Sequence, residues 1–148
     1  MGNTLMGDDG VGVRIAEVLA SRDLGPDIDV VLGGTAGMAL SRHFIDADRV
    51  LVVDAIAAGD EPGSVFRFTP EDAGITALRS HTSHGLSLPN ILLAARLQGA
   101  NPRVVVFAVQ IGDITCGFDT LTADVEAAIP DVVDMVVAEA RLLAAESS

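Results

Sequence analysis

The chain has 148 residues, 49% of them hydrophobic, and a formal net charge of −12, which together suit one compact, acidic domain over residues 1–148. This charge repels nucleic-acid phosphates and anionic membrane surfaces, so neither is an expected partner. No apolar run approaches the roughly 18 residues of a membrane span, the first residues show no secretory signal, and the single cysteine excludes an internal disulfide, so a cytoplasmic protein is predicted.

Segments with strand-like and helix-like periodicity alternate along the chain, with short connections between them. In chain order they are a helix over 11–21, a strand over 28–34, a helix over 36–44, a strand over 49–56, an edge strand over 65–68, a helix over 88–97, a strand over 103–111 and a helix over 121–145, broken or restarted at Pro130. The unbroken Val-Leu-Val-Val run within 49–56 is typical of a strand covered on both faces, and the segment 103–111 is predicted to be another buried strand. This alternation predicts an α/β fold with a largely parallel sheet.

The glycine-rich turn before the first helix carries two adjacent aspartates, Asp8 and Asp9, in "MGNTLMGDDGVGV". A turn of this kind often binds a phosphate, because backbone N–H groups and the helix dipole favour an anion. Two carboxylates within about 4 to 5 Å of a phosphate would each cost on the order of 3 to 4 kcal/mol at an effective dielectric near 20. The turn therefore favours a cation. One aspartate, Asp8, is expected to cap the helix.

A third carboxylate, Asp54, ends the strand stretch "LVVD", at the edge where open α/β sheets bind their ligands. Taken alone, an aspartate at this position fits a simple turn equally well. His81 and His84 lie in the polar loop "SHTSHGLSL". Asp9, Asp54 and one of these histidines offer two carboxylate oxygens and one imidazole nitrogen. That donor set suits zinc, nickel or manganese and leaves coordination positions open.

The remaining histidine and the cysteine are given structural interpretations. His43 is expected to be a polar surface group. Cys116, in "GDITCGFD", is expected to be a small buried residue, because a nucleophilic cysteine would need a neighbouring histidine to lower its pKa.

Four motifs together resemble the nickel-iron hydrogenase maturation proteases: "GNTLMGDDGVGVR", "GGTAG", "VVDAI" and "SHGLSL", in this order. The resemblance covers essentially the whole chain. It implies a three-layer αβα sandwich around a twisted, mostly parallel five-stranded sheet. It also implies an endopeptidase that removes the C-terminal extension of the hydrogenase large-subunit precursor after nickel has been inserted.

Matched by motif, the residues of that family that contact the metal fall on Asp9, Asp54 and His84. The resemblance implies that the nickel arrives with the precursor and acts as a recognition mark that positions the scissile bond. Other divalent metals can bind in its place. Asp9 or Asp54 is the candidate general base.

The chain departs from the resemblance at its start, where an apolar strand is expected directly before "GNT" and none is present. Loss of about five buried aliphatic residues, at roughly 1.5 to 3 kcal/mol each, would remove on the order of 10 kcal/mol of stability. We therefore expect that Met1 is not the natural start.

Two other functions are compatible with the same residues. A non-catalytic metal-binding assembly factor would bind the precursor without cutting it. A nucleotide-binding α/β domain is disfavoured by the aspartates in the turn.

Overall fold

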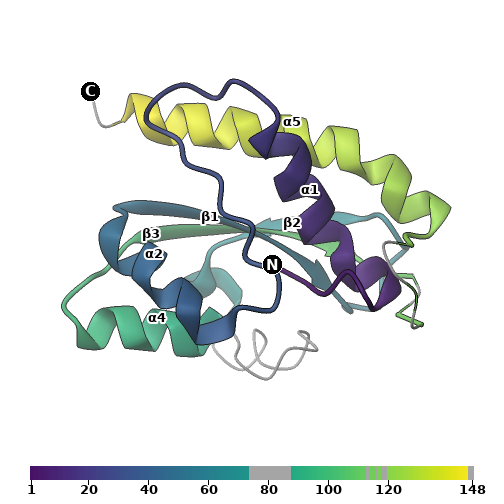
Figure 1. The fold of residues 1–148 in the computed structure, drawn as a ribbon, viewed down its shortest axis with the longest axis horizontal. Helices are drawn as coiled ribbons and strands as arrows, with labels where there is room; N and C mark the ends of the chain where they lie inside the picture. The colour runs from purple at the N-terminus through teal and green to yellow at the C-terminus, as the bar shows by residue number, and fades with distance from the viewer. Residues whose placement is uncertain (74–87, 113, 116, 118–119, 147–148) are drawn as a thin grey trace.

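The computed structural model describes residues 1–73, 88–112, 114–115, 117 and 120–146. Helices α1 (Val11–Ala20) and α5 (Ala123–Ala145) cover one face of a sheet. Helices α2 (Ser41–Asp46) and α4 (Leu88–Leu97) cover the other face (Figure 1). The predicted α/β fold, with helices on both faces of the sheet, is confirmed.

The sheet of the described residues has three strands in the order β1 (Arg49–Ile56), β3 (Arg103–Gln110), β2 (Val65–Phe68). β1 and β3 are parallel, with Asp54 opposite Ala108. β2 runs antiparallel to β3 at the edge of the sheet. All three strands lie where the sequence predicts them.

Two apolar clusters fill the spaces between the sheet and its helices. The cluster against α1 and α5 contains alternate strand side chains, among them Val53 and Phe107. The cluster against α2 and α4 contains the intervening side chains, among them Val52 and Val106. Because successive strand residues point to opposite faces, both faces of β1 and β3 are covered, as the Val-Leu-Val-Val run predicts for β1.

The predicted strand over residues 28–34 is wrong, because the structure has no strand there. These residues form irregular chain beside the outer edge of β1, and a cavity lies between the two. A strand needs a neighbouring strand to receive its hydrogen bonds. The resemblance implies a sheet of five strands, whereas the described residues form three.

The helices lie close to their predicted positions, with one correction at Pro130. The predicted helix over 36–44 is a 3-10 turn, Gly37–Leu40, that runs directly into α2. α5 continues through Pro130 without the predicted break. Pro130 is exposed, so water can replace the backbone hydrogen bond that proline cannot donate.

Among the described residues, no helix combines the length and apolar character needed to cross a bilayer.

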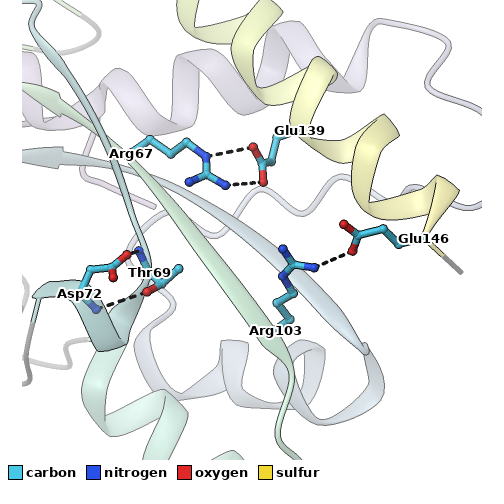
Figure 2. A network of polar contacts seen from close by, with 6 residues as sticks. All are labelled: Arg67, Thr69, Asp72, Arg103, Glu139 and Glu146. Carbon is cyan, nitrogen blue, oxygen red and sulfur yellow. Dashed lines mark hydrogen bonds and ion pairs between the residues drawn. The ribbon is translucent and has the colours of Figure 1, made fainter.

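The chain leaving β2 enters a helical turn at Pro70 through a reciprocal contact between Thr69 and Asp72 (Figure 2). The Thr69 amide donates to the Asp72 carboxylate at 3.0 Å, and the Asp72 amide donates to Thr69 Oγ1 at 3.2 Å. The hydrogen bonds from Thr69 hold the pKa of Asp72 below its usual range. This is a capping box with proline at the first helical position.

Two ion pairs attach α5 to the sheet (Figure 2). Arg67 on β2 donates to Glu139 from Nε at 2.9 Å and from Nη2 at 2.6 Å. Arg103, at the start of β3, donates to Glu146 just beyond the end of α5. Because a two-point guanidinium contact fixes both distance and orientation, the pair between Arg67 and Glu139 is expected to be the stronger one.

Arg67→Met is expected to lower the free energy of unfolding by about 1 kcal/mol at neutral pH. The hydrogen bond from Arg67 holds the pKa of Glu139 below its usual range. The stabilisation is therefore present above the pKa of the unfolded carboxyl and is lost as pH falls through the lowered folded pKa. Urea unfolding at a series of pH values measures this.

Arg42→Met is the matched control, because Arg42 pairs with Asp46 within one helix and both side chains are exposed. Its cost is expected to be below about 0.5 kcal/mol. Equal costs for the two variants, or a cost for Arg67→Met that persists in acid, would contradict the assignment.

Candidate functional site

The aspartate pair lies in a tight 3-10 turn, Gly7–Gly10, that leads directly into α1. Both carboxylates are buried, Asp8 with 0% and Asp9 with 5% of its surface exposed. A buried carboxylate is stable only when donors or a cation compensate its charge. Each of the two carboxylates therefore needs groups that compensate its charge, and the structure gives the two residues different roles.

Asp8 joins three parts of the chain, and the predicted helix cap is wrong. Its Oδ2 accepts from the Gly112 amide at 2.7 Å and from Thr122 Oγ1 at 2.8 Å. Its Oδ1 accepts from the Thr122 amide at 2.6 Å. The residue before α1 is Gly10, and no side chain caps that helix. Asp8 thus ties the first turn to the chain after β3 and to the start of α5.

Asp9 lies beside the first residues of the chain. The Asn3 amide donates to Asp9 Oδ2 at 3.2 Å and to the Asp9 backbone carbonyl at 3.1 Å. Asn3 in turn accepts a hydrogen bond from the Leu5 amide at 3.0 Å, which closes a local turn. The residues before the aspartate pair therefore fold back over it.

Asp54 lies near the carboxyl end of β1, as predicted, and is 8% exposed. Its Oδ1 accepts from the Ala55 amide at 2.9 Å. The turn that carries Asp9 contacts β1. A carboxylate of the turn and a carboxylate of the strand therefore lie at the same part of the fold.

The amino group of Met1 shows that Asp9 and Asp54 share one neighbourhood. This group donates to the Val53 carbonyl. Its burial lowers its pKa, and the negative charges of Asp54 and Asp9 act in the opposite direction. Both carboxylates therefore act electrostatically on one buried nitrogen atom. The structure thus brings together two of the three predicted site residues.

The remaining candidates, His81, His84 and Cys116, lie outside the described residues. Within the part of the chain that the structure describes, no group of three or more His, Cys, Asp or Glu side chains could hold a metal ion. His43 is exposed, as predicted. The third ligand of the predicted site, His84, therefore stays a prediction.

Two residues with structural roles around the site were not predicted from the sequence. Thr122 donates a hydrogen bond to Asp8, which is distant in the sequence. No local sequence pattern predicts this contact. Gly12 lies where α1 meets the backbone of Met1 and Val53, and a Cβ atom there would lie 2.2 Å from the Met1 carbonyl oxygen. The sequence feature that could have identified Gly12 is the presence of a glycine on the apolar face of a predicted helix.

Comparison with known proteins places this arrangement in a family. A sequence model described as hydrogenase maturation protease matches residues 13–139. The hydrogenase 2 maturation protease of Escherichia coli strain K12 is 32% identical over 143 residues, which cover 95% of this chain and 87% of that protein.

Solved structures give the same result. The hydrogenase maturating endopeptidase HybD from E. coli superposes with a TM-score of 0.84 at 32% identity, covering 95% of this chain and 88% of that one. The NiFe hydrogenase maturation protease HybD from Thermococcus kodakarensis gives a TM-score of 0.72 at 26% identity and covers 91% of each chain. The chain therefore belongs to the hydrogenase maturation protease family and is a peptidase.

Proposed function

We propose that this peptidase removes the C-terminal extension of a nickel-iron hydrogenase large-subunit precursor after nickel has been inserted. In this proposal Asp9, Asp54 and His84 contact the nickel that the precursor carries. The nickel is part of the substrate, and the reaction takes place in the cytoplasm.

The observation that supports the proposal most is the convergence of Asp9 and Asp54. Both side chains are buried, and the turn that carries Asp9 contacts the strand that carries Asp54. Two buried carboxylates at one part of the fold form a place where a metal ion can be bound. In this proposal the turn and the strand supply two oxygen ligands.

The donor set also fits a metal that arrives with its own ligands. Two carboxylate oxygens and one imidazole nitrogen suit nickel and leave several coordination positions open. The precursor's own ligands would occupy those positions. A site with so few ligands is expected to bind nickel ions from solution only weakly.

In this proposal, the chemistry is the hydrolysis of one peptide bond. The bound nickel fixes the position of the scissile bond and can polarise its carbonyl. Asp9 or Asp54 takes a proton from a water molecule while the water oxygen bonds to the carbonyl carbon. The C–N bond then breaks, and the proton passes to the departing amine.

Incubation with nickel-loaded and nickel-free precursor tests the proposal. The nickel-loaded precursor is expected to release its C-terminal peptide, which mass spectrometry identifies. The nickel-free precursor is expected to be cleaved at least about tenfold more slowly, the factor that corresponds to about 1.4 kcal/mol of differential binding.

The other outcomes separate the alternatives. Equal cleavage of both precursors would overturn nickel recognition and leave the peptidase activity intact. Tight binding of the nickel-loaded precursor without cleavage would instead favour the non-catalytic assembly factor.

A further inference from the structure

Gln110, the last residue of β3, is a buried polar side chain at the end of an apolar strand. It is 5% exposed, and residues 104–109 before it are all hydrophobic and buried. Burying an amide side chain costs free energy unless its oxygen and nitrogen find hydrogen-bond partners. A glutamine at this position therefore indicates a specific role, and its partners show which one.

The Gln110 side chain holds the loop that leaves β1, residues 57–61. Its Oε1 accepts from the Ala58 amide at 2.8 Å and from the Asp60 amide at 3.4 Å. Its Nε2 donates to the Ile111 carbonyl at 2.9 Å, which fixes the orientation of the side chain. One buried oxygen atom thus accepts two hydrogen bonds from the backbone of this loop.

Gln110 and Asp54 lie on the same face of the sheet. In the ladder between β1 and β3, Asp54 is opposite Ala108, and Ile56 is opposite Gln110. Opposed residues of a parallel pair point to the same face, and so do residues two apart on one strand. The side chain that holds the loop and the candidate metal ligand therefore point to one side of the sheet from neighbouring strands.

The same loop also approaches the turn that carries the two aspartates. Gly112 lies between them, because a Cβ atom at Gly112 would be 3.1 Å from Pro62 Cγ and 3.2 Å from Asp8 Oδ2. Pro62 directly follows the loop, and Asp9 directly follows Asp8. The loop 57–61 therefore lies close to both segments that carry the candidate carboxylate ligands.

The loop is exposed although it is held in position. All of its residues, 57–61, are exposed. Gly59 has a φ of +79°, and no atom beyond its neighbouring residues lies within 4 Å of where its Cβ would be. The Asp60 carboxylate accepts from the Glu61 amide at 2.7 Å, which constrains the loop further. Such a loop offers a preformed contact surface, because little conformational freedom is lost when a partner binds it.

We propose that Gln110 is a positioning residue for precursor cleavage and acts through the loop 57–61, an inference that rests on the proposed function. Gln110 holds the loop as a preformed surface beside Asp9 and Asp54. The precursor segment that carries the scissile bond lies against this surface. The contact is the same in the bound precursor and in the transition state, since the chemistry is assigned to Asp9 and Asp54. Loss of the surface therefore weakens precursor binding and leaves the chemical step unchanged.

Gln110→Met tests the proposal, because methionine keeps the length of the side chain and lacks the acceptor. Hydrogen exchange of the Ala58 amide, measured on the free protein, is expected to become at least about tenfold faster. The KM for the nickel-loaded precursor is expected to rise at least about fivefold, with kcat within about twofold of that of the unmodified protein. Gln110→Glu retains an acceptor oxygen and is expected to keep both values within about twofold.

A second pair of variants tests the loop directly. Ala58→Arg adds a long side chain to the exposed loop, and Ala138→Arg adds the same side chain and charge to an exposed position of α5. The loop variant is expected to raise KM at least about fivefold, and the α5 variant to leave KM within about twofold. This pair decides the question if Gln110→Met does not fold.

An unchanged KM in folded Gln110→Met or in Ala58→Arg would overturn the proposal, and so would unchanged exchange of the Ala58 amide in Gln110→Met. A lower kcat without a higher KM would assign Gln110 a structural role only and would also overturn it.

These outcomes are distinguishable from a failure of the proposed function, which would appear as the absence of cleavage by the unmodified protein. If that protein binds the precursor without cutting it, dissociation constants for the same variants take the place of KM. A protein that neither cuts nor binds the precursor would overturn both proposals.

Discussion

Asp54→Asn is expected to reduce the rate of precursor cleavage by at least about 100-fold. Asparagine has nearly the same shape and can still accept the hydrogen bond from the Ala55 amide. It lacks the negative charge that a metal ligand or a general base needs. Single-turnover cleavage of nickel-loaded precursor measures the loss. Asp9→Asn and His84→Ala are expected to show losses of similar size.

Matched controls separate the site from general effects of charge or of histidine removal. Asp131→Asn removes an exposed aspartate of α5, and His43→Ala removes an exposed histidine of α2. Both are expected to cleave at the rate of the unmodified protein. Thermal unfolding must show that the slow variants are folded. Unchanged cleavage in Asp9→Asn, Asp54→Asn and His84→Ala would refute the site assignment.

Asp8→Asn is expected to lower the free energy of unfolding by about 3 to 5 kcal/mol. Asp8 is completely buried and accepts three hydrogen bonds, one from Gly112 and two from Thr122. An asparagine directs an NH₂ group at donors where a carboxylate offered two acceptors, so at least one buried donor loses its partner. Urea unfolding of the purified variant measures the change.

Asp124→Asn is the control for Asp8→Asn, because Asp124 is an exposed aspartate in the first turn of α5. Its cost is expected to stay within about 0.5 kcal/mol. A cost for Asp8→Asn that is no larger would show that the three hydrogen bonds contribute little. The Asp9 and Asp54 variants are separable from this one, since their expected effect is on cleavage.

The parts of the fold that depend on local patterns were predictable from the sequence. The mostly apolar segments at 49–56 and 103–111 gave β1 and β3, because a short apolar run rich in β-branched residues is typical of a strand covered on both faces. The prediction of a strand over 28–34 was wrong because a strand needs a partner strand as well as a suitable sequence pattern. Residues 28–34 have the pattern but lie beside a cavity.

The positions of two of the candidate site residues were predictable to the same extent. Asp54 follows from its place at the end of a strand and Asp9 from its place in a turn at a helix start. The role of Asp8 could not be predicted, because its partners lie 104 and 114 residues away along the chain. Because Asp8 and Asp9 are adjacent and identical in type, the sequence did not show which of them would accept hydrogen bonds from Thr122.

The buried amino group of Met1 has a consequence for how metal affinity is measured. When it is protonated, this nitrogen places a positive charge beside Asp9 and Asp54, and a titrated metal ion has to compete with that charge. The apparent dissociation constant of a divalent ion therefore includes the free energy needed to displace or neutralise it.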